Sequence, residues 1–270
     1  ESVWKRIQKA GLTEAEVGYL WMDDSLGLIL DKLDTLGIAD NTIVVFVSDH
    51  GSERKGSLIK TRGTEIPCLI RWPKVIKPGS ISNGLLPNTD FVPTWFELAG
   101  AKIPEDYHID GKSLLPMFQD PSVSVRKFIY AEQGAARAIK TDEWEYISLR
   151  YTDEQIASAQ GNRSDRAFKT FLGLSGGISR AKDFHPGTFS ADQLYHLTHD
   201  PTSQKNLAGD QGYARQLRKM KSMLTNTVKK LGPRPYGDFV PGKGTNDAAT
   251  SQKILDKLSV YHTTNGKKKK

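Results

Sequence analysis

The chain has 270 residues, of which 37% are hydrophobic and 26% are charged, a balance typical of a soluble globular protein and not of a disordered or membrane-embedded one. No apolar run in it approaches the ~18 residues of a membrane-spanning helix. Of the net charge of +7, the seven lysines and three aspartates that follow residue 237 supply +4. A charged tail differs from the basic stripe with interleaved aromatics of a nucleic-acid-binding face, so we expect no membrane span and no nucleic-acid partner.

The amino terminus and the cysteine content say little about the cellular compartment of the protein. Residues 1–6 contain no apolar core and no small-residue cleavage site, so we do not expect them to form a signal peptide. Cys68 is the only cysteine, which excludes an internal disulfide and a cysteine-rich metal site. The cellular compartment is therefore unknown from these features alone.

The first predicted element is a helix over residues 13–36. Thr13 and Glu16 have the spacing of a capping box. The apolar residues behind them recur at helical spacing. Gly37 is expected to end the helix in the left-handed conformation.

Two apolar strands, residues 43–47 and 67–72, follow this helix, and a second helix is predicted over residues 90–98. The first of these strands is apolar on both faces, which is typical of a central strand in a parallel sheet. The order helix, strand, loop, strand, helix predicts an open α/β sheet with flanking helices.

The pattern changes near residue 120, where shorter elements begin. They predict a small antiparallel α+β subdomain in which a helix packs on the sheet. The predicted strands are 127–132, 137–141, 144–149 and 193–197, and the predicted helix is 210–231. The expected domains are 1–125, the carboxyl-terminal part of the α/β domain, 126–235, the small subdomain, and 236–270, a basic and flexible tail.

Candidate chemistry follows the strand that ends at Ser48. Asp49 and His50 come directly after it, and ligands of open α/β sheets bind outside the carboxyl ends of the strands. A carboxylate and an imidazole are both metal ligands, and Gly51 lets the backbone turn sharply. We expect the two side chains to face a common crevice at the edge of a mostly parallel sheet. Taken alone, the motif also fits an aspartate that caps the next segment and a surface histidine.

The wider sequence resembles the sulfatase family. Residues 40–51, Asp-Asn-Thr-Ile-Val-Val-Phe-Val-Ser-Asp-His-Gly, are similar to a family segment that ends in Ser-Asp-His-Gly or Ser-Asp-Asn-Gly. Further stretches resemble family motifs in the family's order: 66–73, 77–79, 90–94, 110–116 and 194–208. The resemblance implies an alkaline-phosphatase-like α/β fold with a small carboxyl-terminal subdomain, and hydrolysis of sulfate esters or sulfamates.

The resemblance also implies roles for particular residues. Asp49 is expected to be a calcium ligand, and His50 to lie beside the metal and the bound sulfate. The substrate-binding lysine of the family is matched best by Lys55, and Lys60 is a rival because the match weakens between them. The implied substrate is a small-molecule or carbohydrate sulfate ester, and the implied location is periplasmic or secreted.

The family's nucleophile is missing from the sequence. It is a formylglycine made from the first residue of Cys/Ser-x-Pro-x-Arg, and no such pentapeptide occurs in the 270 residues. Cys68 lies in an apolar strand and is expected to be a small buried hydrophobe. Asp23 and Asp24 lie on a helix, so they do not replace the pair of metal-binding aspartates that the family carries after its first strand. We therefore interpret the chain as the carboxyl-terminal half of a sulfatase, inactive by itself.

Two other functions stay open at this point. A phosphatase or phosphodiesterase of the same superfamily would use Asp49 and His50 as ligands of zinc or manganese, which imidazole suits better than calcium. A binding or scaffold protein would have lost the nucleophile altogether.

Overall fold

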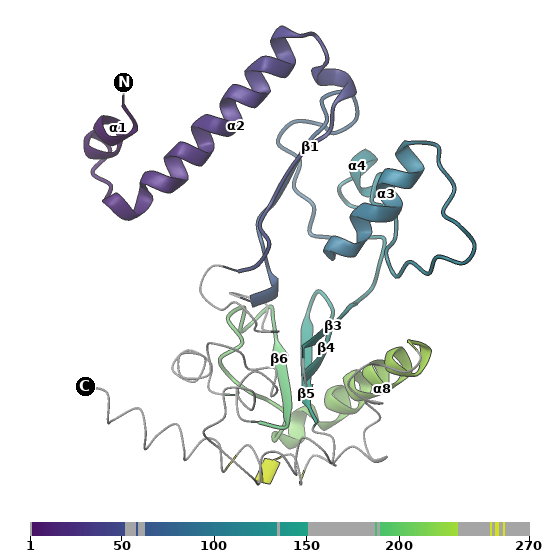
Figure 1. Ribbon diagram of the computed structural model, residues 1–270. Helices are drawn as coiled ribbons and strands as arrows, with labels where there is room; N and C mark the ends of the chain where they lie inside the picture. The colour runs from purple at the N-terminus through teal and green to yellow at the C-terminus, as the bar shows by residue number, and fades with distance from the viewer. Residues whose placement is uncertain are drawn as a thin grey trace, which may run out of the picture. The chain divides into compact units, whose positions relative to one another are not determined.

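The computed structural model describes residues 2–51, 58, 63–133, 136–150, 187, 190–231, 249, 252–253 and 256. The chain divides into two compact units, Glu1–Val47 with Cys68–Ile81, and Ser48–Pro67 with Ser82–Lys270 (Figure 1). In the described residues, each unit has one antiparallel sheet, of two strands in the first unit and four in the second.

The first unit begins with α1 (Val3–Lys9) and the long helix α2 (Val17–Thr35), which a 3-10 turn, Glu14–Glu16, precedes. The backbone N–H of Thr13 donates to Glu16 Oε2 at 2.7 Å, which confirms the predicted capping box. Gly37 follows α2 with a φ of 65°, a conformation in which glycine avoids the clash that a Cβ atom would make. The helix and both of its end signals were therefore predictable.

The apolar side chains of α2 are not buried among the described residues of this chain. Trp21 and Leu28 are 67% and 72% exposed. Helix α1 contacts α2 through an ion pair in which Arg6 Nη1 lies 2.6 Å from Asp24 Oδ1. A helix with this much exposed apolar surface presents a face of the kind that other protein surfaces cover.

Strand β1 (Val44–Val47) pairs with β2 (Cys68–Arg71) in an antiparallel register that runs from Val44↔Arg71 to Val47↔Cys68. The expected parallel pairing of this apolar strand was therefore wrong among the described residues. An apolar run indicates that both faces of a strand are buried. It does not indicate whether the neighbouring strand is parallel or antiparallel.

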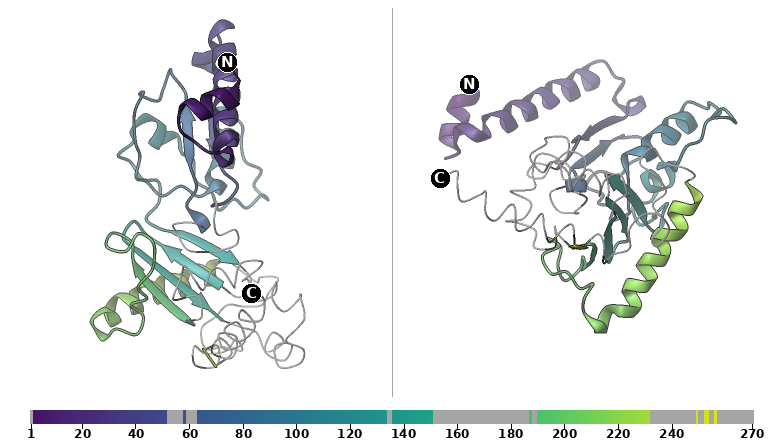
Figure 2. Two further views of the ribbon diagram at one scale, coloured as in Figure 1. Left: turned by 90° about the vertical axis from the view of Figure 1, so that its left-hand side faces the viewer. Right: turned by 60° about the horizontal axis from the view of Figure 1, so that its bottom comes forward.

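The second unit contains the four-stranded sheet and helix α8. The strands are β3 (Ile129–Gln133), β4 (Ala136–Lys140), β5 (Trp144–Leu149) and β6 (Asp192–His196), in sequence order. They confirm the four predicted short strands to within two residues. After a 3-10 turn, Gln211–Tyr213, α8 (Ala214–Lys230) packs along one face of this sheet (Figure 2).

The core of the second unit lies between this face and α8. Ile139, Tyr146 and Leu194 are register partners on β4, β5 and β6, so they form one row across the sheet. Three residues one helical turn apart on α8 pack against the row: Met220, Leu224 and Val228. Their i, i+4, i+8 spacing is the apolar stripe that predicted the helix.

Two of the sequence motifs meet beside α3 (Phe91–Leu98), which follows a 3-10 turn, Asn88–Asp90, and precedes α4 (Leu115–Gln119). The carboxylate of Asp90 is fully buried and accepts two hydrogen bonds from the guanidinium of Arg126. The N–H of Lys112 donates to Asp90 Oδ1 at 2.8 Å. These motifs at residues 90–94 and 110–116 are therefore structural, because they bind each other.

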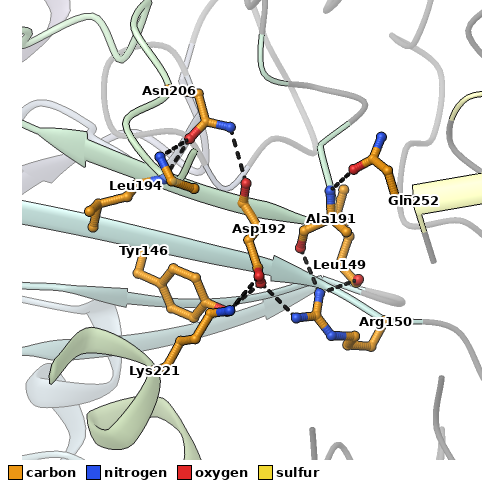
Figure 3. Close-up of polar contacts among 10 residues, drawn as sticks. Tyr146, Leu149, Arg150, Ala191, Asp192, Leu194, Asn206, Lys221 and Gln252 are labelled. Carbon is orange, nitrogen blue, oxygen red and sulfur yellow. Dashed lines mark hydrogen bonds and ion pairs between the residues drawn. The ribbon is translucent and has the colours of Figure 1, made fainter. Parts of the chain in front are cut away.

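The carboxylate of Asp192 joins the sheet to α8 (Figure 3). Its Oδ1 accepts from the hydroxyl of Tyr146 at 2.7 Å and from Arg150 Nη2 at 2.6 Å. Lys221, on α8, donates to its Oδ2. Burial opposes ionisation of Asp192, but the charge of Arg150 and the hydrogen bonds from Lys221, Arg150 and Tyr146 outweigh it and hold the pKa of this carboxyl below its ordinary value.

The backbone around Asp192 is fixed in the same region. Arg150 Nη1 donates to the carbonyls of Leu149 and Ala191 at 2.8 and 2.7 Å. The side chain of Asn206 accepts from the N–H of Leu194 and donates to the carbonyl of Asp192, both at 3.0 Å. Buried polar groups with partners of this kind fix a single arrangement of the strands around them.

The predicted domain limits at 125/126 and 235/236 stay predictions. Most of the predicted tail, residues 236–270, lies outside the described residues. Among the described helices, none has the length and apolar character that crossing a membrane requires.

The network predicts a pH-dependent effect of Asp192→Asn. Because the folded pKa lies below the unfolded value of about 3.9, the ionised carboxylate stabilises the fold at higher pH, and this contribution is lost as the pH falls through the folded pKa. We expect the variant to lower the free energy of unfolding by about 3 kcal/mol at pH 7, with a deficit that shrinks as the pH falls below about 4. Urea unfolding of the variant and the unmodified protein at several pH values between these limits measures this difference in free energy.

The matched control is Asp142→Asn, since Asp142 lies on the exposed turn between β4 and β5. It should leave stability unchanged within about 0.5 kcal/mol at every pH. A deficit for Asp192→Asn that does not vary with pH would contradict the assignment of a stabilising carboxylate.

Candidate active site

The candidate site is the turn that follows β1. The N–H of Ser48 donates to the carbonyl of Pro67 at 3.3 Å, and the N–H of Gly51 donates to the carbonyl of Gly63 at 3.1 Å. The Ser48 hydroxyl closes the turn by donating to the carbonyl of His50 at 2.8 Å. Asp49 and His50 are therefore held between two backbone hydrogen bonds to the same returning segment. They follow an antiparallel strand, and the expected edge of a parallel sheet is absent among the described residues.

The side chains of Asp49 and His50 face each other. His50 Nε2 lies 3.4 Å from Asp49 Oδ2, and His50 Nδ1 lies 2.8 Å from the carbonyl oxygen of Gly51. A carbonyl oxygen only accepts, so Nδ1 is the donor in this bond, and Nε2 is the ring nitrogen that faces the carboxylate of Asp49. Many metal-binding histidines have one ring nitrogen bound to a backbone carbonyl, as His50 has, and the other ring nitrogen on the metal.

The pair fits part of a metal site only. Asp49 is exposed and His50 is partly exposed, so both are open to a further ligand. Calcium requires about 6–8 oxygen ligands, and one carboxylate with one imidazole supplies far fewer. No cluster of three or more His, Cys, Asp or Glu side chains suited to a metal occurs within the described part of the chain.

The two candidate substrate lysines, Lys55 and Lys60, both lie outside the described residues, so their roles stay predictions. The structure describes Leu58 between them, which is 8% exposed. The Thr64 hydroxyl donates to the carbonyl of Leu58 at 3.4 Å. This contact ties Leu58 to residues 63–67, the same returning segment that holds the Asp49–His50 turn.

Cys68 shows no sign of nucleophilic function. It is half-buried on β2, and burial raises the pKa of its thiol. A raised pKa lowers the fraction of thiolate, which is the reactive form. The thiol is a small side chain of an apolar strand, as expected from the sequence, but it is half-buried where a buried side chain was expected.

The sequence interpretation missed a buried ion pair close to this turn. Lys140 Nζ lies 3.0 Å from Glu145 Oε1, and the side chains are 4% and 0% exposed. Lys140 also donates to Thr64 Oγ1. Predicted strands at 137–141 and 144–149 around a tight turn place residues 140 and 145 opposite each other, so the hairpin spacing with opposite charges was the signal available.

Comparison with known proteins assigns the chain to a class. A sulfatase family model matches residues 18–101. An ulvan-active sulfatase of Formosa agariphila is 32% identical over 214 residues, which are 76% of this chain and 40% of that protein. An N-acetylglucosamine-6-O-sulfatase of Bacteroides thetaiotaomicron is 28% identical over 222 residues, 78% of this chain and 34% of that protein. The chain thus spans well under half the length of these curated relatives.

Solved structures agree on the fold. A protein in complex with its substrate D-glucosamine-2-N,6-O-disulfate superposes with a TM-score of 0.57 at 25% identity, over 79% of this chain and 39% of that one. A phosphonate monoester hydrolase of Agrobacterium radiobacter superposes with a TM-score of 0.51 at 20% identity, over 80% and 40%. The fold is the alkaline-phosphatase-like α/β fold, here with antiparallel sheets in the described residues. Within that class, the chain belongs to the sulfatase family.

The ligand count predicts weak calcium binding by the 270-residue chain itself. We expect isothermal titration calorimetry to show no saturable binding of calcium below about 1 mM, because Asp49 and His50 are only two of the several ligands that calcium requires. Circular dichroism of the same sample checks that the chain is folded. Saturable binding at micromolar concentrations, abolished by Asp49→Asn, would show that this chain holds a complete site.

Proposed function

We propose that the chain is part of a sulfuric ester hydrolase and supplies one side of its active site. The observation that carries the proposal is the Asp49–His50 turn, in which a carboxylate and an imidazole ring nitrogen face each other in a chain of the sulfatase family. The nucleophile of the proposed enzyme is a formylglycine in a segment outside these 270 residues.

Asp49 and His50 have distinct parts in the proposed site. Asp49 provides a hard oxygen ligand for a divalent cation, with calcium as the proposed ion. His50, oriented by its bond to the Gly51 carbonyl, would supply Nε2 to the metal or to the bound sulfate. A metal bound there would supply positive charge that stabilises the negative charge on the sulfate oxygens.

Lys55 is the proposed cation for the sulfate group or the leaving oxygen, and Lys60 is the alternative. An ammonium on a four-carbon stem acts as a mobile point charge, which suits an anionic substrate. The carbohydrate substrates in the names of the relatives support a sulfated carbohydrate as the substrate class. The family resemblance also favours a periplasmic or secreted enzyme.

Exposed apolar surface in the first unit supports the proposal that this chain is part of a longer polypeptide. Large apolar side chains on α2 and β2 are open to solvent, with Leu69 at 63%. The relatives are also more than twice as long as the stretch that matches this chain. We propose that further sulfatase sequence covers this surface in the complete enzyme.

A phosphatase or phosphodiesterase is the second candidate. The alkaline-phosphatase-like fold is shared with a phosphonate monoester hydrolase, so fold alone does not decide between sulfur and phosphorus. The imidazole of His50 is also a good ligand for zinc or manganese. Sulfate and phosphate esters of one aryl alcohol, assayed side by side, separate the two functions.

The proposal predicts that the full-length protein hydrolyses an aryl sulfate with calcium present and that Asp49→Ala lowers kcat/KM at least ~10³-fold, since removing one charged group from a site of transition-state stabilisation costs about this much. We expect Lys55→Ala to lower it more than Lys60→Ala. Steady-state kinetics on purified variants measure both effects.

Two control variants change a carboxylate and a thiol that lie outside the Asp49–His50 turn. Asp23→Ala, on α2, and Cys68→Ser, on β2, should retain activity close to that of the unmodified enzyme. Faster turnover of the aryl phosphate than of the aryl sulfate would reject the sulfatase function. Full activity of the 270-residue chain alone would show that the nucleophile lies within it.

A further inference from the structure

The face of the four-stranded sheet opposite α8 carries a buried polar row. Lys140 on β4, Glu145 on β5 and Tyr195 on β6 are register partners, as their neighbours Ile139, Tyr146 and Leu194 are on the apolar face. Burial, followed by the charges of Glu145 and Asp200, raises the pKa of the Tyr195 phenol well above its ordinary value.

Burying the charges of Lys140 and Glu145 costs desolvation free energy, so this row contributes little net stability. A buried ion pair is often no more stable than apolar residues of similar volume. The side chain of Ser203 adds a hydrogen bond to Glu145 Oε2 at 3.3 Å, so Glu145 is held from a second direction. The pair also has an orienting effect, because Glu145 fixes the position of the Lys140 ammonium.

The ammonium of Lys140 acts on the segment that returns to the candidate site. It donates to the hydroxyl oxygen of Thr64, and that hydroxyl donates in turn to the carbonyl of Leu58. A hydroxyl that accepts from a cation is a stronger donor, so the two bonds reinforce each other. Thr64 directly follows Gly63, whose carbonyl accepts the N–H of Gly51.

We propose that Lys140 is a positioning residue of the active site, which holds the Asp49–His50 turn through Thr64 and Gly63. The inference rests on the proposed function, since it concerns the same pair of ligands. The contacts run from the ion pair on the small sheet to Thr64, from Gly63 to Gly51, and from Gly51 along the backbone to His50. Lys140 itself touches neither metal nor substrate in this assignment.

The test is amide hydrogen exchange of the full-length protein carrying Thr64→Val, which removes the hydroxyl and leaves the Lys140–Glu145 pair in place. The substitution removes the bond accepted from Lys140 and the bond donated to the Leu58 carbonyl, and we expect exchange at the Gly51 N–H to rise about tenfold or more. Exchange at Ile139 and Tyr146, in the sheet core, should stay unchanged. Thr64→Ser, which keeps the hydroxyl, should behave as the unmodified protein does.

Variants of the ion pair extend the test. Lys140→Met with Glu145→Gln removes both charges without leaving one unpaired, and it should raise Gly51 exchange as Thr64→Val does. Lys140→Arg should restore most of the protection, because a donor is present again. Lys221→Met is the matched control, since Lys221 pairs with Asp192 on α8 and has no described contact with the turn.

Activity gives a second readout that separates this inference from the proposed function. In the full-length enzyme, Thr64→Val should lower kcat for an aryl sulfate about tenfold or more, with little change in KM, and Thr64→Ser should not. If the enzyme hydrolyses another ester, the exchange experiment still decides the positioning role. Unchanged Gly51 exchange in Thr64→Val, or an equal rise in Lys221→Met, would overturn the inference.

Discussion

The carboxylate of Asp192 is the group on which the second unit depends. It accepts hydrogen bonds from β5, from the end of β5 and from α8, so one partly buried charge joins the sheet and its helix. Three donors around one carboxylate outweigh the cost of its burial, and the depressed pKa reflects this balance. The apolar row beneath α8 packs on the same sheet.

The two faces of this sheet have separate tasks. One face carries the row Ile139, Tyr146 and Leu194 against α8 and provides the core. The other carries Lys140 and Glu145, of which Lys140 contacts Thr64 on the segment that returns to the Asp49–His50 turn. A register shift of one residue would exchange the two faces, so the same pairing that builds the core also directs Lys140 toward the turn.

Local patterns predicted most of the elements. The capping box at Thr13 and the stripe of α8 act within a few residues, and the structure has both where the sequence puts them. Strand direction was not predictable for β1, because its apolar side chains say only that both faces are to be covered.

Contacts between distant residues were also beyond local patterns. Asp90 and Arg126 are 36 residues apart, and Thr64 and Lys140 are 76 apart, so no periodicity links them. Asp49 and His50 could be singled out from the end of an apolar strand and from the family resemblance. The bond from His50 to the Gly51 carbonyl, and the contact of Nε2 with Asp49, could be found only from the structure.

A crystal structure of the full-length protein with calcium and an unreacted sulfate ester analogue would show whether Asp49 and His50 hold the metal. We expect a metal ion with Asp49 Oδ at about 2.3–2.6 Å, the range for calcium–oxygen bonds, and His50 Nε2 directed at the metal or the sulfate. A metal and sulfate bound elsewhere, with Asp49 and His50 in contact with neither, would contradict it.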